Sequence, residues 1–276
     1  MQAAAQAGAP AAPALALEDI TVTFVGDGEA RFTAVRDATL VVRPGEFVSV
    51  VGPTGCGKST LLNVAAGLLA PSAGRVSVFG APLRGLNGKA GYLFQSESLL
   101  PWRTALDNVM VGLEFRRMPR DEALARAENW LARVGLRGHG HRYPHQLSGG
   151  MRKRVALAQT LILDPQIILM DEPFSALDVQ TRVLMENELL ELWSADRKSV
   201  VFITHDLEEA ISLSDRVVVL SAGPASRPIG EFEIDLPRPR DVAEIRLAPR
   251  FIELHTRIWH AMREEVLKGY EQQKNQ

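Results

Sequence analysis

The stretch Gly52-Pro53-Thr54-Gly55-Cys56-Gly57-Lys58-Ser59-Thr60 decides the fold of this chain. It fits the phosphate-loop pattern G-x-x-x-x-G-K-[ST], whose glycines let the backbone wrap a phosphate so that successive N–H groups point inward as donors. Residues 46–51 precede it and are typical of a short buried strand, and residues 61–66 follow it and predict a helix. The start of that helix adds a partial positive charge at the same point. The sequence therefore predicts a binding site for a nucleoside triphosphate.

Three side chains of this loop carry chemistry of their own. Lys58 supplies a full positive charge for the β- and γ-phosphates, and Ser59 supplies a hydroxyl ligand for Mg²⁺. Cys56 is the one cysteine of the chain and occupies a variable position of the pattern. We expect its side chain to point away from the phosphate and its thiol to make the site sensitive to oxidation. A single cysteine forms no intrachain disulfide, which favours a reducing compartment.

The composition bounds the class of protein. The 276 residues are 46% hydrophobic, enough for a sizeable core, and the net charge of −2 gives no electrostatic footprint for nucleic acid. Residues 1–16 are rich in Ala, Gln, Pro and Gly and lack the basic and apolar regions of a signal peptide, so we predict a disordered tail. No run approaches the roughly 18 apolar residues that a membrane span needs.

Strands and helices alternate along most of the chain, which predicts a parallel α/β sheet. Two strands near the N-terminus suggest a separate β-rich region, and the stretch of about 96–164 lacks strands and predicts an inserted helical subdomain. Residues 251–267 predict a C-terminal helix. The predicted strands are 20–24, 38–42, 46–51, 75–79, 91–94, 167–170, 200–204 and 216–220, and the other predicted helices are 121–134, 149–163, 179–193 and 207–212.

A second anion-binding helix start follows at Leu147-Ser148-Gly149-Gly150-Met151. A Ser-Gly-Gly sequence at the beginning of a helix offers backbone N–H groups to an anion. Further along, the apolar run 167–170 ends in Asp171 and Glu172, as expected of a central parallel strand. One chain thus carries two phosphate-binding helix starts and an acidic pair at the end of a buried strand.

These motifs, in this order, resemble those of the ATP-binding-cassette (ABC) ATPases over about residues 17–220. Residues 147–151 resemble the family signature Leu-Ser-Gly-Gly-Gln, with Met151 in place of Gln. Residues 167–172 resemble the Walker B strand with its catalytic glutamate, residues 175–178 the D-loop, Gln95 the Q-loop glutamine and His205 the switch histidine. The resemblance implies an α/β fold with a P-loop NTPase (RecA-like) core, an N-terminal antiparallel β region and an inserted α-helical subdomain. The implied ligands are ATP and Mg²⁺.

The resemblance also implies a role for each polar residue. Asp171, together with Ser59 and Gln95, would hold Mg²⁺. Glu172 is next in sequence, so on an extended backbone we expect it to point away from Asp171 and to act as general base on the attacking water. His205 would contact the γ-phosphate and help to hold that water. Gln95 would also transmit the nucleotide state to the helical insert.

An aromatic side chain of the N-terminal β region is expected to stack on the adenine. Phe24 is the first candidate, because the family carries this aromatic shortly after its first strand, and Phe32 is the competitor. Either residue could instead belong to the core.

The chain has no predicted membrane-spanning domain and resembles the separate ATPase subunit of a bacterial importer. The resemblance implies a homodimer, in which Ser148, Gly149 and Gly150 complete the partner's site. It also implies membrane-spanning permease subunits, an indirect link to a periplasmic solute-binding protein, and a peripheral location on the cytoplasmic face of the inner membrane. Leu236-Pro237-Arg238-Pro239-Arg240-Asp241 and Met151 resemble the nitrate/sulfonate/taurine importer subfamily.

Other functions remain open at this point. A cassette protein of DNA repair would interrupt the core with long coiled coils, and no heptad run is present. A non-hydrolytic scaffold would not need Lys58, Asp171, Glu172 and His205 together. An importer ATPase for a vitamin precursor is a further alternative. The expected domains are a tail over 1–16, an ATPase domain over 17–230 and a C-terminal helical extension over 231–276.

Overall fold

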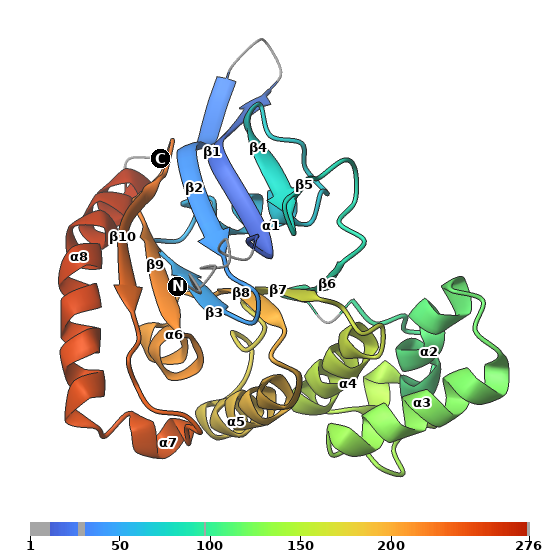
Figure 1. Cartoon of the computed structure of the whole chain (residues 1–276). Helices are drawn as coiled ribbons and strands as arrows, with labels where there is room; N and C mark the ends of the chain where they lie inside the picture. Colours follow the sequence, from blue (N-terminus) through green and yellow to red (C-terminus); the bar gives the residue numbers. More distant parts are fainter. Residues whose placement is uncertain (1–11, 27–30, 97, 275–276) are drawn as a thin grey trace, which may run out of the picture.

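The computed structural model describes residues 12–26, 31–96 and 98–274, and its centre is a six-stranded sheet (Figure 1). Its strand order is β10-β9-β3-β8-β7-β6. All neighbouring strands are parallel except β10, which pairs antiparallel with β9 at the edge. This arrangement confirms the predicted parallel α/β core. The strands are β3 (Phe47–Val51), β6 (Ala90–Leu93), β7 (Ile167–Asp171), β8 (Ser199–Ile203), β9 (Arg216–Leu220) and β10 (Pro228–Glu233).

Both faces of this sheet are covered, so its central strands are buried throughout. Side chains of β3 show the alternation. Val48 and Val50 face α1 (Lys58–Ala65) and the smaller sheet, whereas Phe47 and Val51 face the helices on the opposite side. Those helices are α5 (Val179–Asp196), α6 (Leu207–Leu213) and α8 (Pro249–Lys274).

The N-terminal β region is an antiparallel sheet of order β2-β1-β4-β5. It begins earlier than expected, because Leu15 and Ala16 belong to its first strand and are buried. Leu15 pairs with Val42 on one side and with Val78 on the other. The predicted tail over 1–16 is therefore wrong for residues 14–16: Ala14 is buried and bonded to Val42, and Leu15 and Ala16 belong to the strand. Residues 1–11 lie outside the described residues. The strands are β1 (Leu15–Val25), β2 (Arg31–Val42), β4 (Ala73–Val78) and β5 (Ala81–Pro82).

The stretch between β6 and β7 is helical, as predicted, and projects to one side of the sheet (Figure 1). It has a hydrophobic cluster of its own, in which Val109, Leu113, Leu131 and Val155 are buried together. The sequence patterns did not single out the helix over 105–115, whose start is capped by the Thr104 hydroxyl accepting the Asp107 N–H at 3.2 Å. The elements are α2 (Ala105–Phe115), α3 (Arg120–Arg133), a short 3-10 helix (Pro144–Gln146) and α4 (Gly149–Leu161).

The C-terminal extension is built into the core. A boundary at residue 230/231 is wrong, because β10 runs to Glu233 and pairs with β9. Beyond α7 (Val242–Ile245), the long α8 buries Leu254 and Ile258 against Val217 and Val219 of β9. Within the three described ranges, no helix is at once long enough and apolar enough to cross a membrane.

Substituting two tryptophans, one buried and one exposed, tests how much the packing of this core contributes to the free energy of unfolding. Trp193 of α5 is 2% exposed and packs edge-on against Phe47, with ring centroids 5.6 Å apart. We expect Trp193→Ala to lower the free energy of unfolding by about 3–5 kcal/mol, because it removes a large buried ring and leaves a cavity.

The matched control is Trp102→Ala, since Trp102 is 72% exposed. Its effect should stay within about 0.5 kcal/mol. Urea unfolding followed by circular dichroism measures both variants, and equal shifts of the two midpoints would contradict this packing.

Candidate functional site

The phosphate loop connects the end of β3 to the start of α1, as the sequence pattern requires. Gly55 and Gly57 have φ values of 79° and 93°, a region that favours glycine. A Cβ on Gly57 would also lie 2.7 Å from a methyl group of Val35. Gly57 caps α1 without any side-chain hydrogen bond, and the first turn of α1 holds no acidic residue. The first N–H groups of this helix are therefore available to an anion.

Lys58 is the first residue of α1 and is almost fully buried in the loop. Its ammonium donates to the carbonyl oxygens of Gly52 at 2.9 Å and of Pro53 at 3.1 Å. These bonds hold the charge at the wall of the cavity described next, where a phosphate could take the remaining donor.

A cavity of about 480 Å³ lies over this loop. Its lining includes Phe24 and Phe32, which are cross-strand partners in β1 and β2 and are both partly exposed. The structure thus brings both adenine-stacking candidates together. The other residues of its lining are Ala34, Thr54, Gly55, Gly57, Lys58, Ser59, Thr60, Gln95, Glu172 and His205.

Ser59 lines the cavity and contacts Asp171, which is not part of the lining. The Ser59 hydroxyl donates to a carboxylate oxygen of Asp171 at 3.0 Å. Burial raises the pKa of Asp171, and the neighbouring Glu172 adds to the rise, while the Ser59 hydroxyl and Lys58 oppose it. A hydroxyl and a desolvated carboxylate side by side are a donor set that suits Mg²⁺, whose charge would favour the ionised form of Asp171.

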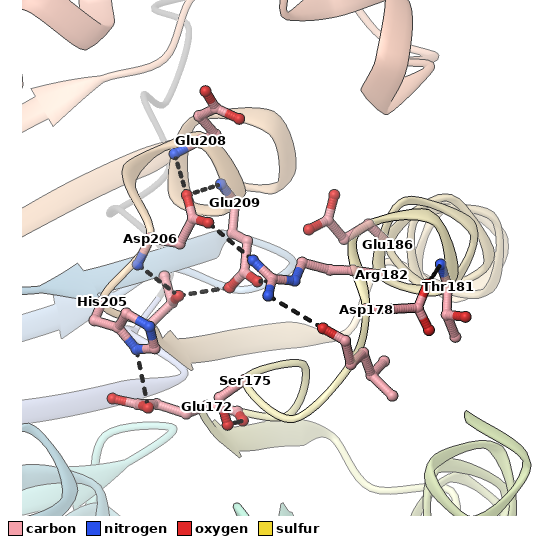
Figure 2. Close-up of polar contacts among 12 residues, drawn as sticks. Glu172, Ser175, Asp178, Thr181, Arg182, Glu186, His205, Asp206, Glu208 and Glu209 are labelled. Atoms are coloured by element: carbon pink, nitrogen blue, oxygen red, sulfur yellow. Dashed lines mark hydrogen bonds and ion pairs between the residues drawn. The ribbon is translucent and has the colours of Figure 1, made fainter. Parts of the chain in front are cut away.

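Glu172 and His205 form a hydrogen-bonded pair beside the same cavity (Figure 2). The Nδ1 atom of His205 lies 3.0 Å from a carboxylate oxygen of Glu172. The expectation that strand alternation orients Glu172 is wrong, since β7 ends at Asp171 and Glu172 has a φ of 43°. A left-handed turn, fixed by the Glu172 N–H donating to Ile203 at 2.9 Å, sets its direction instead.

Gln95 follows β6 and is exposed at the cavity's edge. Its backbone carbonyl accepts a hydrogen bond from the ammonium of Lys153 on α4. The segment at Gln95 is therefore tied to the helical subdomain, whereas its side chain faces the cavity.

The signature residues Ser148, Gly149 and Gly150 do not line this cavity. Ser148 caps α4, and its hydroxyl accepts the Met151 N–H at 3.2 Å. Figure 1 places α4 with the helical subdomain, whereas α1 lies under the smaller sheet. Within one copy of the chain, the two predicted anion-binding helix starts do not share a site.

The side chain of Cys56 points into the core, and Cys56 lines no part of the cavity. Its side chain is fully buried against Gly52. Burial raises the pKa of its thiol, and the charge of Lys58 only partly opposes this, so the expected sensitivity to oxidation is not supported. Ser226, which no sequence pattern signalled, donates from its hydroxyl to the Cys56 carbonyl and supports the loop from behind.

Comparison with known proteins adds to this geometry. Residues 35–175 match the family model described as ABC transporter. An uncharacterised ABC transporter ATP-binding protein of Methanocaldococcus jannaschii is 46% identical over 92% of this chain and 93% of its own length.

The chain belongs to the ABC transporter family. It is an ABC-type ATPase.

Two further relatives and one solved structure are also similar to this chain. The taurine import ATP-binding protein of Yersinia pestis is 45% identical over 69% of this chain and 75% of its own length. The nitrate import ATP-binding protein of Synechococcus elongatus is 39% identical over 91% of this chain, which matches 38% of that longer protein. The structure of the ATP-binding cassette MJ0796, a dimer bound to ADP and Pi, superposes with a TM-score of 0.72 at 33% identity, over 81% of this chain and all of that one.

The thiol of Cys56 provides a test of the loop's packing. Because burial raises its pKa and covers the sulfur, we expect Ellman's reagent at pH 8 to modify the native protein at least about tenfold more slowly than the urea-unfolded chain. Absorbance at the wavelength of the released thionitrobenzoate measures both rates. Equal rates in the two states would show that the loop opens freely.

Proposed function

We propose that this ABC-type ATPase is the ATP-hydrolysing subunit of a bacterial importer and works as a head-to-tail homodimer. The proposal of a dimer rests on one observation. Lys58, Glu172 and His205 line the cavity, whereas Ser148 of the signature does not. The Ser148 cap uses the Met151 N–H, and the glycines at this helix start let an anion approach its backbone, so we infer that the signature completes the site of a second copy. The dimeric state of the MJ0796 cassette supports this reading.

The residues divide the chemistry as follows. The loop N–H groups and Lys58 bind the β- and γ-phosphates of ATP, and the Phe24–Phe32 pair offers a surface for the adenine. Glu172 takes a proton from the attacking water as general base, and His205, hydrogen-bonded to Glu172, holds that carboxylate and the γ-phosphate in register. Ser59 and Asp171, with Gln95 at the edge, would hold Mg²⁺, which would neutralise phosphate charge when bound.

We infer an ATPase domain with one inserted subdomain for this function, with the boundaries moved by the structure. The ATPase domain runs from about residue 15 and includes β10, and within it residues 96–164 form a helical subdomain. We infer that this subdomain receives the permease, because Lys153 ties it to the segment of Gln95. ATP hydrolysis would then take place at the cytoplasmic face of the inner membrane, and nucleic acid is not a partner.

The named relatives support the solute class. Taurine and nitrate are small solutes that carry an oxyanion, and the two import proteins named for them are 45% and 39% identical to this chain. We infer import of a taurine, alkyl sulfonate or nitrate type of solute, delivered by a periplasmic solute-binding protein to the permease.

Trapping the dimer tests the assignment of Glu172. Glu172→Gln keeps the shape of the side chain but removes the base, so ATP should bind and remain. We expect this variant to form a stable dimer in saturating Mg-ATP, with ATP turnover reduced by about 10²-fold or more. Multi-angle light scattering measures the mass and phosphate release measures the turnover.

Lys58→Ala in the Glu172→Gln background is the control. It leaves phosphate charge without its partner, so nucleotide binding and the dimer should both be lost. A Glu172→Gln variant that binds ATP yet stays monomeric would contradict the proposed dimer, whereas full turnover by that variant would contradict the role of Glu172.

The solute class is tested by growth. Deleting the gene from its host should abolish growth on taurine or an alkyl sulfonate as sole sulfur source, or on nitrate as sole nitrogen source. The wild-type gene should restore growth, and the Glu172→Gln allele should not, because the permease then lacks its energy source. Normal growth of the deletion strain on all three, with loss of uptake of another solute, would place the protein in a different importer class.

A further inference from the structure

An arginine outside the cavity joins the two segments that carry the catalytic pair (Figure 2). Arg182 lies in the first turns of α5, just after the loop 175–178 that follows Glu172. One guanidinium nitrogen donates to the Leu177 carbonyl at 3.3 Å, and another donates to a carboxylate oxygen of Asp206 at 3.1 Å. Arg182 therefore connects the segment after Glu172 with the residue next to His205.

Asp206 is fixed from two sides. Its other carboxylate oxygen caps α6 by accepting the N–H groups of Glu208 at 2.8 Å and Glu209 at 3.3 Å. The Asp206 N–H donates to the Thr204 hydroxyl at 3.0 Å, and that hydroxyl donates to Glu209 at 2.5 Å. The backbone on both sides of His205 is thus part of one hydrogen-bonded turn.

Arg182 also supplies the charge that this turn lacks. Glu209 is buried and lies 3.6 Å from Nε of Arg182, and Asp206 is close by. The side chain of Arg182 is only 24% exposed, so its attraction to the two carboxylates is less screened than at the surface. Without this charge, two carboxylates at the start of α6 would face each other with little compensation.

A second arginine, Arg246, also contacts both α5 and α6. Arg246, in the C-terminal extension, contacts Glu208 at 3.3 Å and the fully buried Glu186 of α5 at 3.0 Å. Arg246 thus ties α5 to α6, but its ion pairs are with Glu186 and Glu208 rather than with Asp206.

We propose that Arg182 is a positioning residue for ATP hydrolysis: it holds the turn 204–209 against the loop after Glu172, and so keeps His205 within hydrogen-bonding distance of Glu172. It acts through His205 and does not touch the nucleotide cavity. This inference rests on the proposed roles of Glu172 and His205.

The test separates positioning from folding. We expect Arg182→Gln to lower kcat for ATP by about tenfold or more while the Kd for ATP, measured by calorimetry, changes less than about twofold, since the phosphate loop is untouched. Arg182→Lys keeps the charge near Asp206 but loses the planar fork that also reaches Leu177, so its kcat should lie between those of the wild type and the Gln variant.

Arg238→Gln is the matched control. Arg238 also pairs with a carboxylate, Asp215 at 2.8 Å, and with a backbone carbonyl, that of Leu213 at 2.7 Å, but Asp215 binds the N–H of Phe47 at the far end of β3 from the phosphate loop. The Arg238→Gln variant should lose about as much free energy of unfolding as Arg182→Gln but keep the kcat of the wild type.

Two further measurements decide whether Arg182 acts through His205. In a His205→Ala background, single-turnover hydrolysis should fall less than about twofold on adding Arg182→Gln, because coupled residues are not additive. Hydrogen exchange of peptides covering the turn 204–209 should speed up in Arg182→Gln and not in Arg238→Gln, whose contact is at the other end of α6. Unchanged exchange, unchanged kcat, or a full additive loss would overturn the inference, whereas absence of ATP turnover in the wild type would overturn the proposed function instead.

Discussion

The uncapped start of α1 is the constraint on which the rest of the structure depends. A helix whose first N–H groups have no side-chain cap must find another acceptor, and an anion is the ligand that its dipole favours. The fully buried β3 fixes the position of that start, and Gly55 and Gly57 give the loop the left-handed backbone that it needs. The charge of Lys58, bonded to two loop carbonyls, adds to the same point.

The two consecutive carboxylates at the end of β7, Asp171 and Glu172, differ because of their surroundings. Asp171 is still part of β7, lies next to Ser59, and has a raised pKa because it is desolvated. Glu172 has left the strand through a left-handed turn and meets His205. Two adjacent acids thus meet different partners, Ser59 and His205, because the backbone changes direction between them.

The C-terminal extension belongs mechanically to the ATPase core. It contributes β10 to the sheet, and α8 covers Val217 and Val219 of β9. Through Arg246 it also contacts α5 and α6, which flank the turn of His205. The segment after the family core therefore stabilises the elements that carry the site rather than forming a separate lobe.

The sequence by itself determined the phosphate loop, the order of the motifs and the parallel sheet, because glycine spacing and strand-like apolar runs act over a few residues. Only the tertiary structure decided the turn at Glu172, the pairing of Phe24 with Phe32, and the link from Arg182 to Asp206 across 24 positions. These depend on register and on ion pairs between distant segments. No local pattern records such contacts, since they form only when the sheet brings the ends of its strands to one edge.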